Sequence, residues 1–182
     1  MRFTHVALLP EDPKDLKEMI LTAAETTHVV FPVFSDKEQL PPDIYPRSLA
    51  ADNLGQAHTK TNTTVLAYPG SLQARYFAAY AEILAMVQND GQPHRVEIPA
   101  LVVFLKGNAG ICVLGLPLKA DPECASQVFL NYLDVLESSP SPELFARLQA
   151  VSEQAGMAAE NGSGAALEVL KKAIEILLDL LK

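Results

Sequence analysis

The segment that decides the fold class is residues 100–118, Ala-Leu-Val-Val-Phe-Leu-Lys-Gly-Asn-Ala-Gly-Ile-Cys-Val-Leu-Gly-Leu-Pro-Leu. Its two apolar runs, Ala100–Leu105 and Ile111–Leu118, flank the polar stretch Lys106–Gly110. The glycines of that stretch can adopt the positive φ angles of a tight reversal. The segment therefore predicts an antiparallel hairpin, and Cys112 inside the second run is expected to be a buried thiol.

Strand and helix patterns alternate on the N-terminal side of this hairpin. Asp12-Pro13 is typical of a helix start, because Asp12 can accept from free amides of the first turn and Pro13 has no amide to leave unpaired. The apolar spacing then predicts a helix over 13–26 and another from Leu72 to Gln88 with Ser71 as its N-cap. The expected strands are Phe3–Leu9, His28–Phe34, Thr64–Tyr68 and His94–Ile98.

Two further helices are expected after the hairpin, because Asp121-Pro122-Glu123 and Ser141-Pro142-Glu143 repeat the cap-and-proline pattern. An α+β fold accounts for this order, with a mixed β-sheet of about five to six strands, helices packed on it and an extra C-terminal helix. The expected organisation is a single α+β domain over 1–160, a flexible junction at 161–164 and a Leu-rich amphipathic helix over 165–182.

The long connection over 35–62 suggests a binding loop or an oligomer contact, since loops of this length are uncommon in compact domains. It ends near Tyr68-Pro-Gly-Ser71, where a helix start could receive an anion. The candidate ligand-binding residues are therefore His58, Lys60, Tyr68, Gly70 and Ser71. The alternatives are a plain helix cap at Ser71 and a solvated loop around His58.

Composition and spacing exclude several function classes. The 182 residues carry a net charge of −8, which disfavours nucleic acid as a partner. The histidines are scattered singly and no phosphate-loop, dinucleotide or nucleophile-elbow motif is present, so we expect no metal and no cofactor and can name no catalytic residue. Whether the chain is an enzyme stays open. Without an export signal or an apolar run long enough for a membrane span, we expect a cytoplasmic protein and no membrane partner.

The C-terminal segment 165–182 differs in composition from the rest of the chain, because it contains only Ala, Leu, Val, Ile, Glu, Asp and Lys. At about 100° per residue its charged side chains fall within one arc of roughly 100°, and the remaining arc is apolar. So wide an apolar arc needs contacts on two sides. The predicted interface residues follow three-four spacing, as in a helical bundle: Leu167, Leu170, Ile174, Leu177 and Leu181.

This segment resembles de novo designed assembly helices attached through a Gly-Ser-Gly-like junction, while residues 1–160 carry no family motif that we recognise. The resemblance implies an engineered fusion whose helix forms a helical-bundle interface; a natural terminal helix packed over its own sheet is the alternative. The first hypothesis is thus an assembly protein that forms a homo-oligomer through this helix, with the 35–62 loop as a second contact. The alternative is a small-ligand-binding protein or small enzyme that uses the 35–62 loop and the helix start at Ser71.

Overall fold

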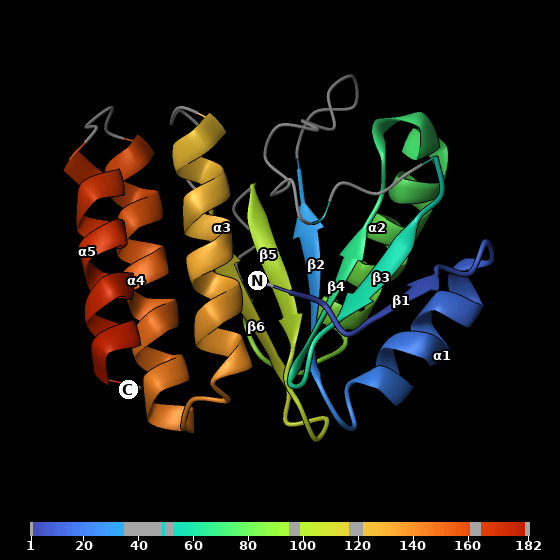
Figure 1. Cartoon of the computed structure of the whole chain (residues 1–182), viewed down its shortest axis with the longest axis horizontal. Coiled ribbons are helices and arrows are strands. Elements are labelled where there is room, and N and C mark those ends of the chain that lie inside the picture. Colours follow the sequence, from blue (N-terminus) through green and yellow to red (C-terminus); the bar gives the residue numbers. More distant parts are fainter. Residues whose placement is uncertain are drawn as a thin grey trace.

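The computed structural model describes residues 2–34, 49, 53–94, 99–116, 122–160 and 165–180. Within them a six-stranded mixed sheet is combined with helices, so the α+β class is confirmed (Figure 1). The strands are β1 (His5–Leu8), β2 (His28–Val33), β3 (Gln56–Thr59), β4 (Thr63–Ala67), β5 (Ala100–Phe104) and β6 (Ile111–Gly115). The helices are α1 (Pro13–Ala23), the 3-10 turn η2 (Gly70–Leu72), α2 (Gln73–Gln88), α3 (Pro122–Glu137), α4 (Pro142–Glu160) and α5 (Ala165–Leu180).

The strand order is β1-β3-β4-β2-β5-β6. The β4–β2 pair is parallel and all other neighbouring pairs are antiparallel. The predicted hairpin is β5 and β6, and the positive φ angles of Gly107 and Gly110 in its turn confirm the reason given for it. β1 pairs with β3 at the edge of the sheet, so α1 connects two strands that are not neighbours.

Helices cover both faces of the sheet. Phe31 of β2 stacks on Tyr76 of α2 with ring centroids 5.5 Å apart, while His28 of the same strand lies 5.2 Å from the Phe145 ring of α4. Since alternate residues of a strand face opposite sides, these contacts place α2 and α4 on opposite faces. Figure 1 shows the same layers, with α1 and α2 on one side of the sheet and α3, α4 and α5 on the other.

The sequence signals for helix starts are confirmed at two helices. The Lys14 amide donates to Asp12 Oδ1 at 2.8 Å at the start of α1, and the Leu144 amide donates to Ser141 Oγ at 3.4 Å at the start of α4. The expected cap of α2 is wrong, because Ser71 lies inside η2 and neither η2 nor α2 has a side-chain cap. A chain that enters α2 through a 3-10 turn has already passed Ser71 when the α-helix begins.

β3 is a strand that sequence analysis missed, since its residues fall within the 35–62 segment taken as a loop. The predicted strand at 94–98 and the junction at 161–164 cannot be compared, because 95–98 and 161–164 lie outside the described residues. Cys112 is buried as expected, and burial raises the pKa of its thiol to about 12. None of the described helices is long and apolar enough to cross a membrane.

Candidate functional site

The predicted ligand-binding residues do not form one site. His58 is in β3 and Lys60 follows it in the β3–β4 turn, whereas Tyr68, Gly70 and Ser71 come after the far end of β4. His58 and Tyr68 also belong to opposite faces, because His58 pairs with Val65 and alternate residues of β4 point to opposite sides. The prediction of a pocket that joins the loop to the helix start therefore has no support in the described residues.

His58 and Tyr68 are both parts of packed surfaces. His58 is buried with its ring against Phe3, and desolvation lowers the pKa of its imidazole. Tyr68 packs on Phe31 and Tyr76, and burial raises the pKa of its phenol to about 12. His58 thus lies in a strand and not in the loop to which sequence analysis assigned it.

Hydrogen bonds connect the turn that contains Lys60 to the end of α3. The carboxylate of Glu137 accepts hydrogen bonds from the amides of Thr61 and Asn62 at 3.1 and 3.0 Å. The Asn62 side-chain amide donates to the Glu137 carbonyl at 2.9 Å, and Lys106 Nζ donates to Asn62 Oδ1 at 2.8 Å. These bonds explain why so polar a stretch is ordered: they hold the hairpin to the helix that covers it.

His28 lies buried beside this hydrogen-bonded turn. Its Nδ1 accepts from the Lys106 amide at 3.0 Å, so the neutral ring carries its proton on Nε2, which has no partner among the described residues. Desolvation, reinforced by the Lys106 charge and opposed by Glu137, lowers the pKa of His28 to about 4. The folded chain therefore keeps His28 neutral under mildly acidic conditions.

A pH dependence of stability follows from His28. Between its unfolded pKa of 6.5 and its folded pKa of about 4, the unfolded chain binds the extra proton, so the free energy of unfolding falls as the pH falls through this window. The expected loss between pH 7 and pH 5 is roughly 2 kcal/mol. The measurement is urea unfolding at a series of pH values. In His28→Asn, whose Oδ1 can still accept from the Lys106 amide, the curve should be flatter; an unchanged slope would show that His28 is not its source.

Among the described residues, side chains of the helices bond to outward backbone groups of the edge strand β6 but not to those of the edge strand β1. At the β6 edge, Ser152 of α4 accepts from the Gly115 amide, and the hydroxyl of Tyr132 in α3 donates to the Gly115 carbonyl at 2.8 Å. The neighbouring residue Leu116 bonds back to Pro99, so in an alternating ladder the Gly115 groups point outward. Side chains thus cap the outward backbone groups of β6 at this position.

The β1 edge has no such cap among the described residues. All four β1 residues are exposed, and Val6 and Leu8 expose 49% and 64% of their surface. The Leu9 amide donates to the Gly55 carbonyl at 3.0 Å, so the alternation of the ladder directs the backbone groups of Val6 and Leu8 away from β3. An exposed apolar edge strand is a template for pairing with another strand.

The predicted interface helix α5 packs on its own chain. It contacts both α3 and α4, and Ile174 is fully buried in the hydrophobic core. Ile174 therefore meets another subunit only if α5 leaves this position. Its exposed side carries Ile176 and Leu180, which expose 61% and 63% of their surface. The side chains of the other predicted interface residues, Leu167, Leu170, Leu177 and Leu181, lie outside the described residues.

Among the described residues, no group of three or more His, Cys, Asp or Glu side chains is placed to hold a metal ion. Comparisons with protein-family models, with curated proteins and with solved structures found no match. Function is therefore inferred from the geometry of the described residues, in which β1 forms an exposed apolar edge of the sheet.

Proposed function

We propose that the chain is an interaction protein that assembles with a second copy of itself. The observation that carries the proposal is the open, apolar β1 edge, in contrast to the β6 edge, whose outward backbone groups at Gly115 are capped by side chains. Natural sheets usually protect their edges with charges, prolines, bulges or covering elements. An exposed apolar edge strand suits strand addition, which would join two sheets across a two-fold axis.

The sequence of β1 is compatible with antiparallel pairing to its own copy. The outward backbone groups belong to Val6 and Leu8, so pairing must join these even-numbered residues of the two copies. The register centred on Ala7 does so, because it places Val6 opposite the partner's Leu8. In that register each Val6 and Leu8 exchanges backbone hydrogen bonds with the other copy. Directly opposed residues share one face of a sheet, so these side chains would also cover one another's apolar surface.

Charge favours an antiparallel arrangement. Arg2 precedes β1 and the exposed acids Glu11 and Asp12 follow it, so antiparallel pairing would bring the basic side of one strand toward the acidic side of the other. Pairing at this edge would therefore add charge attraction to apolar contact in a chain whose net charge of −8 otherwise opposes self-association.

The test is the mass of the protein in solution, measured by light scattering over a range of concentrations. The native chain should form a dimer, and Val6→Lys with Leu8→Lys should give a monomer, because two cations on each edge would face one another. Val6→Pro should have the same effect, since it removes an outward N–H and leaves the bonds to β3 in place.

The matched control is Ile176→Lys with Leu180→Lys, which adds the same charges to the outer side of α5. We expect this variant to remain dimeric. If it dissociates while the β1 variants stay associated, the C-terminal helix is the interface and the β1 proposal is wrong. A native chain that is monomeric at all concentrations would refute self-assembly altogether.

A further inference from the structure

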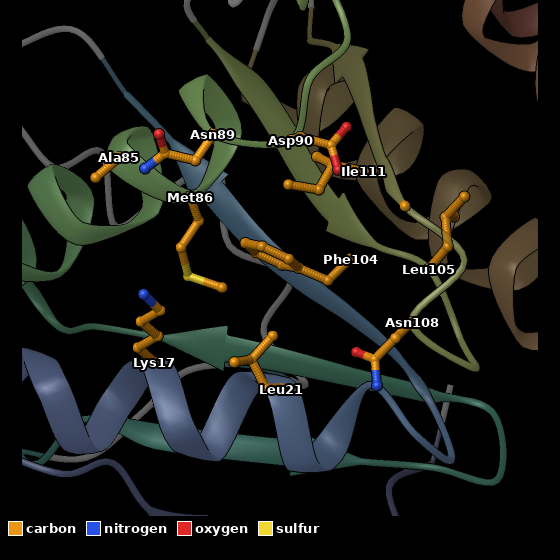
Figure 2. Close-up of a pocket in the computed structure, with 11 residues that line it drawn as sticks. Lys17, Leu21, Ala85, Met86, Asn89, Asp90, Phe104, Leu105, Asn108 and Ile111 are labelled. Atoms are coloured by element: carbon orange, nitrogen blue, oxygen red, sulfur yellow. The ribbon is translucent and has the colours of Figure 1, made fainter.

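A pocket of about 290 Å³ opens where α1 and the end of α2 meet the β5–β6 turn (Figure 2). Its volume is near the lower end of the range for small-molecule sites, which is about 300–1,000 Å³. It therefore suits a compound with one ring and not a nucleotide or a larger cofactor. None of the proposed assembly contacts uses the residues that line it.

The floor of the pocket is apolar and includes an aromatic ring. Figure 2 shows the Phe104 side chain in the middle of the pocket, with Met86 and Leu21 beside it. Phe104 is buried, Met86 is partly buried, and Leu21 exposes 43% of its surface toward solvent. A flat apolar group could lie on this floor, cover the exposed surface of Leu21 and Met86, and contact the small part of the Phe104 ring that reaches the pocket.

The two charged residues that line the pocket, Asp90 and Lys17, differ in whether they have an ion-pair partner among the described residues. Asp90 already pairs with His94, whose Nε2 lies 2.6 Å from Asp90 Oδ2. Lys17, whose side chain extends from α1 toward Met86 in Figure 2, has no carboxylate within ion-pair distance among the described residues. Asp90 and Lys17 lie on different sides of the pocket in that view, so an anion near Lys17 need not approach Asp90.

We propose that this pocket binds a small aromatic carboxylate, with its ring on Phe104 and its carboxylate paired with Lys17. The side-chain amides of Asn89 and Asn108 also line the pocket and provide donors for a further polar substituent. The ammonium of Lys17 selects for an anion, and the Phe104 floor selects for a ring. A neutral or cationic ring compound of the same size lacks the first of these interactions.

The experiment is an NMR titration of the full chain with 3-phenylpropionate and, separately, with 3-phenylpropylamine, which has the opposite charge. We expect saturable binding of the carboxylate in the millimolar range or tighter, with shifts at the Met86 methyl group and at the side-chain amides of Asn89 and Asn108. The amine should bind more weakly. Because the chain has no Trp, NMR is preferable to intrinsic fluorescence.

Reversing the charge of one lysine of α1 at a time distinguishes binding in the pocket from attraction by the overall charge of the protein. Lys17→Glu should weaken carboxylate binding about tenfold and favour the amine, whereas Lys14→Glu, with the same change in net charge, should weaken it less than about threefold. Equal effects of the two variants, amine binding as tight as carboxylate binding, or shifts confined to other regions would overturn the proposal. Absence of saturable binding, or shifts of the same signals on dilution alone, which would indicate a second copy in the pocket, would also overturn it.

Discussion

Replacing Ile174 by aspartate is expected to lower the free energy of unfolding of the whole domain by about 4 kcal/mol or more. Ile174 is fully buried in the core, and α5 contacts both α3 and α4. An aspartate there loses the apolar contacts of isoleucine and must either bury a charge or take up a proton. Because single domains are stable by only about 5–15 kcal/mol, this loss is large enough to unfold the chain or to release α5.

The control is Ile176→Asp on the same helix, two residues later. Ile176 exposes 61% of its surface, so the same chemical change should cost less than about 1 kcal/mol. Urea unfolding followed by circular dichroism measures both variants. If Ile174→Asp does not fold, Ile174→Ala gives the same comparison at an expected cost of about 2–5 kcal/mol. Similar stabilities of the two aspartate variants would mean that α5 is a detached helix and not part of the core.

The apolar pattern of the C-terminal segment predicts some features of α5 and not others. The wide apolar arc correctly indicates a helix with contacts on two sides, because α5 packs on both α3 and α4. The arc does not show whether those contacts belong to the same chain. Hydrophobic burial has no preference for partners within or between molecules, so only the positions of α3 and α4 distinguish the two arrangements.

Fold class was predictable because its signals are local. The glycines of the β5–β6 turn and the cap at Asp12 have their effects within a few residues, and the structure confirms both. β3 was not predictable in the same way. It is four residues long and contains a buried histidine, and its order depends on pairing with β1 and β4 and on a neighbouring turn held by Glu137 from far along the chain.

Neither the pocket nor the open edge had a signal in the sequence. The pocket combines α1, α2 and the β5–β6 turn, and its Lys17 is one of several similar lysines in the sequence. The apolar residues of β1 looked like those of any half-buried strand. Their exposure depends on the strand order, which places β1 at the edge, and strand order is a property of long-range pairing.

Replacing Tyr76 by phenylalanine is expected to reduce the free energy of unfolding by about 2–4 kcal/mol, although only one oxygen atom is removed. The Tyr76 hydroxyl accepts from the Phe34 amide at 2.9 Å and donates to the Pro32 carbonyl at 3.1 Å. It thereby joins the first turn of α2 to the end of β2. Both hydrogen bonds are buried, and a buried polar group that loses its partner costs about 1–3 kcal/mol.

The ring of Tyr76 should keep its place in the variant, because it stacks on Phe31 and contacts Tyr68 and Phe77. Packing is therefore nearly unchanged and the measured loss reports the two hydrogen bonds. Tyr80→Phe is the matched control: it lies one turn later on α2, its ring stacks on Tyr76, and its hydroxyl makes no hydrogen bond seen in the described residues. It should change the free energy of unfolding by less than about 0.5 kcal/mol. If thermal or urea unfolding shows equal effects for the two variants, the hydroxyl of Tyr76 does not hold the end of β2 to α2.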